Sequence, residues 1–124
     1  MFGTEYIFML LDSNPGNDVV EKVALFESMI KGETSAFFDV EDFELIIEYY
    51  LELDFKKKAK KALEIALEQY PIDLALTLIK IEFLNSSQRF DESLKALNNL
   101  NKFHPNNIDV VLGLGRLYSL MENN

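Results

Sequence analysis

The fold is decided by the stretch Val40–Pro71, which reads VEDFELIIEYYLELDFKKKAKKALEIALEQYP. Its apolar residues recur at helical spacing, and we interpret the stretch as two amphipathic helices. Proline cannot continue an α-helix, so Pro71 marks the end of the second helix. Pro105 follows 34 residues later and closes a similar segment. A pair of helices that recurs at this interval predicts a helical repeat protein.

The residues at fixed positions of these segments resemble the tetratricopeptide repeat (TPR) consensus. In a unit that begins at Val40, the matching positions are Phe43, Ile46, Ile47, Tyr50, Ala59, Leu63, Ala66 and Pro71, with Ile47 where the family prefers glycine. A unit from Leu74 keeps the spacing and loses several consensus residues, with Thr77, Lys80, Ile81, Leu84, Ser93, Leu97, Leu100 and Pro105. A third unit from Ile108 carries Leu114-Gly115 followed by Tyr118, the most characteristic short string of the family.

The resemblance implies an all-α fold, a right-handed superhelical solenoid of antiparallel helix pairs in which stacked units share one core. It divides the chain into residues 1–39, a leader with a capping helix at about 18–31, and TPR units at 40–73 and 74–107. The first helix of a truncated third unit follows at 108–124.

Residues 1–39 do not follow the repeat. Asp18 and Glu21 suggest a capping box, and Gly32 stands where a helix ends. Between them Val19, Val23, Phe26 and Ile30 form an apolar stripe, which we expect to cover the first repeat. Asp39 is the expected N-cap of the next helix, with Phe37 and Phe38 buried between cap and repeat.

The earlier segment Tyr6–Leu11 leaves three alternatives open. It is a short helix or strand packed on the capping helix, a leader, or an association surface. The residues Asn14 to Asn17 read as a turn.

Composition indicates a cytoplasmic helical domain with no membrane span. Hydrophobic residues make up 48% of the 124 residues, cysteine is absent, and no run of about 18 apolar residues occurs. The net charge of −9 disfavours nucleic acid, whose phosphates require cationic contacts. His104 is the one histidine and no glycine-rich phosphate loop occurs, so we expect no catalytic residues, metal site or cofactor.

The resemblance places a concave partner-binding groove on the first helix of each unit. The corresponding positions are Glu41, Glu44, Leu45, Glu48, Leu51 and Glu52; Ala75, Leu78, Ile79, Glu82, Asn85 and Ser86; and Asp109, Leu112, Gly113, Arg116, Ser119 and Leu120. The implied function is a protein–protein interaction module that holds a peptide or partner helix. Family members that clamp an acidic C-terminal tail need cations in this groove, where this chain has acids.

Charge patterns in the first unit leave alternatives open. Glu44, Glu48 and Glu52 share one helical face, which is either a solvated acidic surface or a site for a basic or amphipathic peptide. The lysines between Lys56 and Lys61 are either a solvated face or ion-pair partners of the acidic first helix.

The C-terminal segment offers a second class of function, that of a structural array or homodimer. We expect an apolar association surface that further repeats or a second copy would cover, made of Leu114, Leu117, Tyr118 and Met121. The run Phe37–Phe43, with the acidic helix and lysine-rich helix after it, also resembles TPR proteins of Bacteroidetes. That resemblance implies a bacterial source and the same fold, and no ligand.

Overall fold

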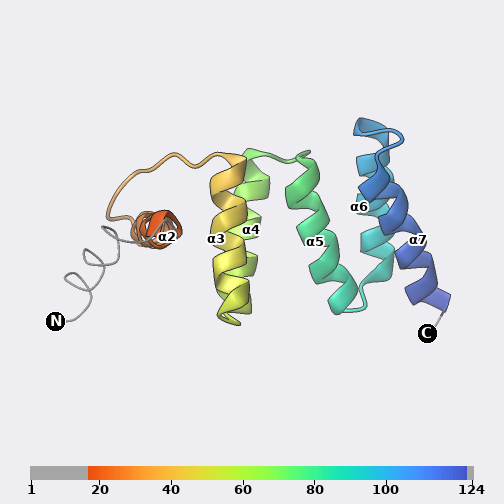
Figure 1. The fold of residues 1–124 in the computed structure, drawn as a ribbon, viewed down its shortest axis with the longest axis horizontal. Helices are drawn as coiled ribbons and strands as arrows, with labels where there is room; N and C mark the ends of the chain where they lie inside the picture. Colours follow the sequence, from red (N-terminus) through yellow and green to blue (C-terminus); the bar gives the residue numbers. More distant parts are fainter. Residues whose placement is uncertain (1–16, 123–124) are drawn as a thin grey trace. The chain divides into compact units, whose positions relative to one another are not determined.

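The structure is a computed structural model that describes residues 17–122 and contains six α-helices and no strand within them (Figure 1). The helices are α2 (Asn17–Ile30), α3 (Val40–Glu52), α4 (Lys56–Gln69), α5 (Leu74–Ser86), α6 (Phe90–Phe103) and α7 (Ile108–Glu122). The expected all-α class is therefore correct. The expectations for residues 6–11 and 14–16 fall outside the described residues.

The chain divides into two compact units, Met1–Ala62 and Leu63–Asn124, with the boundary inside α4. No helix within residues 17–122 is both long enough and apolar enough to cross a bilayer.

The helices follow the 34-residue interval of the sequence. Helices α3, α5 and α7 begin at Val40, Leu74 and Ile108, each 34 residues after the last, and α4 and α6 begin at Lys56 and Phe90. The interval is thus a property of the backbone as well as of the proline spacing.

A polar side chain precedes each first helix and caps it at the same interval. The carboxylate of Asp39 accepts from the Asp42 amide at 2.8 Å, and Asp42 in return accepts from the Asp39 amide at 3.1 Å. Asp73 accepts from the Leu76 amide at 3.0 Å, and Asn107 accepts from the Asp109 amide at 2.9 Å. These bonds satisfy amides that have no partner within the helix, so they determine where each helix begins. The N-cap predicted at Asp39 is confirmed.

The end of α2 agrees with the sequence, and its start does not. Gly32 adopts φ +79°, its amide donates to Met29 O at 3.0 Å, and the Glu33 amide donates to Ser28 O at 3.0 Å, the Schellman arrangement that favours glycine. The expected capping box required Asp18 to be the N-cap, but Asp18 lies inside the helix. Because α2 already includes Asn17, Asp18 lies within the first turn, where its negative charge favours the helix N-terminus.

Three phenylalanines form the core between α2 and α3. The rings of Phe26, Phe38 and Phe43 lie 5.7 to 6.2 Å apart, centroid to centroid, and all three are buried. The expectation that Phe37 is buried beside Phe38 is wrong, because Phe37 is 81% exposed. Adjacent residues of an extended segment point to opposite sides, so only Phe38 reaches this core.

A polar cluster joins α2, α3 and the start of α4 within the first unit. The Tyr50 hydroxyl donates to the Glu27 carboxylate at 2.7 Å, and the Lys58 ammonium donates to the same carboxylate oxygen at 3.3 Å. Lys58 also lies over the rings of Tyr50 and Phe55, 5.8 and 5.4 Å from their centroids. Lys58 of the lysine run therefore forms an ion pair with Glu27 of α2. The sequence suggested the acidic first helix of the same repeat, α3, as the ion-pair partner.

The Glu27 cluster predicts a loss of stability in acid. Burial raises the pKa of Glu27, but the hydrogen bonds from Tyr50 and Lys58 outweigh burial and leave the pKa below its usual value of 4.5. The folded state thus holds the charged form, and its stabilising effect is present above about pH 4.5 and is lost as the pH falls through the folded pKa. Glu27→Gln should lower the free energy of unfolding by about 0.5–1 kcal/mol at pH 7, since the carboxylate is partly exposed.

Urea unfolding of both proteins between pH 3 and 7 checks this, and the difference between them should shrink towards pH 3. Glu21→Gln, an equal charge change at an exposed position of the same helix, should have little effect. A difference that stays constant with pH would contradict a charge-linked role for Glu27.

In the second unit, α6 contacts both α5 and α7. The buried core consists of Ile81 from α5, Leu97 and Leu100 from α6, and Val110 and Leu117 from α7. Most of the residues expected to form an association surface are therefore not exposed. Leu117 is fully buried and Leu114 and Met121 pack against the core, which leaves Tyr118 as the exposed member of the four. These leucines face α6, so substitution of Leu117 would test folding rather than association.

Candidate binding site

A pocket of about 240 Å³ lies between α5, α6 and α7 in the second unit. Its lining consists of Leu78, Ile81, Glu82, Asn85, Leu97, Asp109, Leu112, Gly113 and Arg116. Seven of these nine residues are positions that the TPR resemblance places in the groove.

The 34-residue interval explains why α5 and α7 supply equivalent residues. Leu78 and Leu112 are one interval apart, and so are Glu82 and Arg116. Residues one interval apart occupy equivalent positions of the two helices. The pocket therefore has paired leucines on its walls and paired charged residues at its rim.

The charge of the pocket is unbalanced. Glu82 and Asp109 are acidic and Arg116 is the one basic residue of the lining. Leu112 is 62% exposed and extends the apolar wall towards solvent. An apolar group with an adjacent cation fits this combination of leucines and carboxylates.

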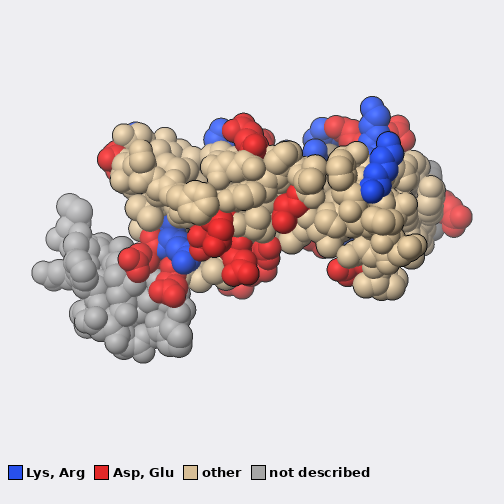
Figure 2. Space-filling view, turned by 90° about the horizontal axis from the view of Figure 1, so that it is seen from above, with Lys and Arg blue, Asp and Glu red and all other residues tan. Residues whose placement is uncertain are grey.

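Most of the groove residues expected on α3 are exposed. Glu41, Leu45, Glu48, Leu51 and Glu52 are exposed and Glu44 is half-buried, and all belong to the first unit. Figure 2 shows acidic side chains gathered on the surface of that unit. Of the remaining expected positions, Ala75, Ile79, Ser86, Ser119 and Leu120 do not line the pocket.

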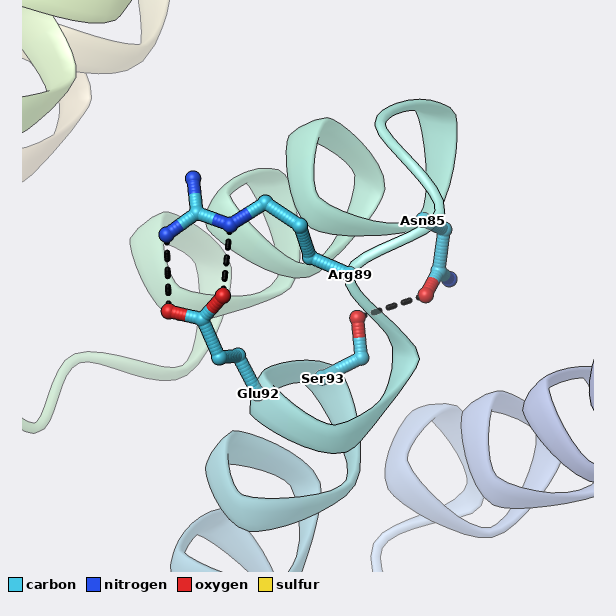
Figure 3. A network of polar contacts seen from close by, with 4 residues as sticks. All are labelled: Asn85, Arg89, Glu92 and Ser93. Atoms are coloured by element: carbon cyan, nitrogen blue, oxygen red, sulfur yellow. Dashed lines mark hydrogen bonds and ion pairs between the residues drawn. The ribbon is translucent and has the colours of Figure 1, made fainter.

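A polar contact orients Asn85 at the edge of the pocket (Figure 3). The hydroxyl of Ser93, which is fully buried, donates to the Asn85 side-chain oxygen at 2.6 Å and so links the end of α5 to the start of α6. Beside it, Arg89 forms a two-bond ion pair with Glu92, with Nη2 2.7 Å from Oε1. Asn85 is thus held by a partner that cannot move to solvent.

The pocket is small. A volume of about 240 Å³ lies below the usual range for small-molecule sites and suits one or two apolar side chains of a larger partner. No three acidic or histidine side chains within residues 17–122 are grouped so as to hold a metal ion.

Gly113 allows α7 to approach α6 at the base of the pocket. A Cβ atom at Gly113 would lie 3.0 Å from Leu97 Cδ2, closer than ordinary van der Waals contact, whereas one at Gly115 would meet no atom within 4 Å. Leu97 is fully buried and has little room to move.

These two glycines form a matched pair for mutation. Gly115→Ala should raise the free energy of unfolding by about 0.5–1 kcal/mol, because alanine has the higher helix propensity. Gly113→Ala should gain less than this or lose stability, because the added methyl group meets Leu97. Thermal and urea unfolding measure both, and equal stabilisation by the two substitutions would show that the approach of α7 to α6 is not tight.

Comparisons with protein-family models, with curated proteins and with solved structures find no match for this chain.

Sequence reasoning missed several residues that build pockets. Ile81 and Leu97 line the pocket although their spacing indicated core positions. In the first unit a second pocket of about 260 Å³ is lined by Phe26, Glu27, Ile30, Lys31, Tyr50, Lys58 and Lys61. It depends on contacts between residues 23 and 31 positions apart, Glu27 with Tyr50 and Lys58, for which no short motif exists.

Proposed function

We propose that this chain is a TPR-like interaction module that holds a peptide or partner helix, with no catalytic role of its own. The observation that carries the proposal is the pocket between α5 and α7, lined by equivalent positions of helices that begin 34 residues apart. The same interval relates the helix caps, which supports a repeat architecture and, by extension, the superhelical solenoid of the TPR family. The absence of cysteine is compatible with a cytoplasmic location.

The partner that best fits the pocket is a basic, amphipathic segment. An apolar side chain would enter between Leu78 and Leu112, and a neighbouring cation would lie close to Glu82 or Asp109. Nucleic acid is a poor partner for a chain of net charge −9.

Selection of displayed peptides against the chain tests this function. Selected peptides should combine a large apolar residue with lysine or arginine, and Leu112→Glu should weaken their binding at least tenfold, about 1.4 kcal/mol, in calorimetric titration. Leu25→Glu, at an exposed leucine of α2, is the matched control and should bind as the native chain does. Peptides without basic residues, or affinities that survive Leu112→Glu, would contradict the proposal.

One observation favours homodimerisation as a second candidate function. On α7, Val111 is 51% exposed and Tyr118 is 52% exposed, whereas Thr77 and Leu84, one interval earlier on α5, are buried. Thr77 lines a pocket together with residues of α6, so α6 lies beside this part of α5. The equivalent face of α7 would suit a helix from a second copy.

Light scattering over a concentration series measures this association. A dimer that Val111→Lys converts to a monomer would support it, because Val111 is exposed and the substitution spares the core. Leu25→Lys, at an exposed leucine of α2, serves as the control. A monomer at all concentrations would exclude this second function.

A further inference from the structure

Two large core positions of the first repeat are occupied by a small and a charged residue in the second. Phe43 and Ile46 on α3 are fully buried. One interval later, on α5, the chain has Thr77 and Lys80. Threonine occupies much less volume than phenylalanine, and a lysine is rarely buried without a partner. The second repeat should therefore leave space beside these two residues.

The structure has a pocket of about 260 Å³ at this place, in the second unit. Thr77 and Lys80 both line it, together with apolar residues that include Leu67, Leu100 and Phe103. Ile72 and Phe103 are about half-exposed, which gives the pocket an apolar mouth. It is a different cavity from the α5–α7 pocket, and the two share no lining residue.

The hydroxyl of Thr77 lacks a partner at this pocket. Thr77 is 9% exposed, and its Oγ1 atom is buried with no hydrogen-bond partner among the described residues. A threonine within a helix commonly donates to the carbonyl four residues earlier, and an unpaired buried hydroxyl destabilises the fold. An unsatisfied polar group beside an apolar cavity points to a bound group that the chain itself does not supply.

Lysines lie at and beside the same pocket. A neighbouring surface hollow shares Lys80, Ala96 and Asn99 with it and is also lined by Lys95 and Lys102. The one acid of that hollow, Glu92, is bound by Arg89, whose hydrogen bonds lower the pKa of Glu92, with Lys80 and Lys95 lowering it further. Figure 2 shows basic side chains at this end of the chain with acidic side chains beside them.

We propose that this pocket is a second binding site, which takes one aromatic or branched apolar side chain of an acidic peptide. The peptide's carboxylates would pair with Lys80, Lys95 and Lys102. A backbone carbonyl of the peptide would accept from the Thr77 hydroxyl, and the apolar side chain would lie against Leu100 and Phe103. The chemistry is opposite to that proposed for the α5–α7 pocket, whose carboxylates select a basic partner. The two sites therefore distinguish two partners by charge.

Three labelled peptides test the site by fluorescence anisotropy. The probe Asp-Glu-Phe-Asp-Glu should bind, whereas Asp-Glu-Ser-Asp-Glu, without the apolar anchor, and Lys-Lys-Phe-Lys-Lys, with the opposite charge, should bind at least tenfold more weakly. Raising the salt concentration from about 0.05 to about 0.5 M should weaken the binding of the acidic probe, because its ion pairs with the lysines are exposed to solvent. A Kd of the acidic probe above about 1 mM would overturn the proposal.

Matched variants locate the binding. Thr77→Phe restores the residue type of the first repeat and should abolish binding by filling the pocket. Phe103→Ser at the mouth should weaken binding without refilling the core, so the proposal stays testable if Thr77→Phe does not fold by circular dichroism.

The double variant Lys80→Glu with Lys95→Glu should lose binding at least tenfold, and the control Lys57→Glu with Lys60→Glu, of equal charge change on α4, should not. Equal losses from the two double variants, or native binding by a folded Thr77→Phe or by Phe103→Ser, would overturn the site.

Discussion

The packing of α6 against both of its neighbours organises the second unit. Leu97 and Leu100 are buried in one core with residues of α5 and α7. The same two buried leucines also line cavities, since Leu97 lines the α5–α7 pocket and Leu100 lines the pocket at Thr77. Both candidate sites therefore depend on the position of one helix. A change that displaces α6 would alter stability and both pockets together.

The sequence predicted those features that depend on residues close together in the chain. A cap needs only one side chain three positions before an amide, so Asp39 could be recognised, and Gly32 marked a turn of positive φ. The 34-residue interval predicted where α3, α5 and α7 begin. Asp73 and Asn107 could have been found by carrying Asp39 forward by the same interval.

Features that depend on the direction of a side chain could not be predicted from the sequence as well. Phe37 and Phe38 are chemically alike, and only the path of the extended segment decides that Phe38 packs on α2. Leu117 belongs to an apolar stripe whose exposed or buried side depends on where α6 lies. Helical periodicity identifies an apolar face but does not say which neighbour covers it. The Glu27–Tyr50–Lys58 cluster has the same origin, because distant segments must meet before its bonds exist.

Departures from the repeat pattern explain where the pocket at Thr77 lies. The consensus match is best in the first repeat, where Phe43 and Ile46 are fully buried. If the second repeat carried the same residues, the space beside α6 would be filled and Lys80 would not stand at its rim. Threonine at position 77 buries less apolar volume than a phenylalanine would, and its hydroxyl is unpaired. Both differences reduce stability. Local departures from the rules that stabilise a fold are expected at functional sites. Thr77 and Lys80 are among the residues that weaken the consensus match of the second repeat, and both line its pocket. The weak match and the pocket therefore have the same cause.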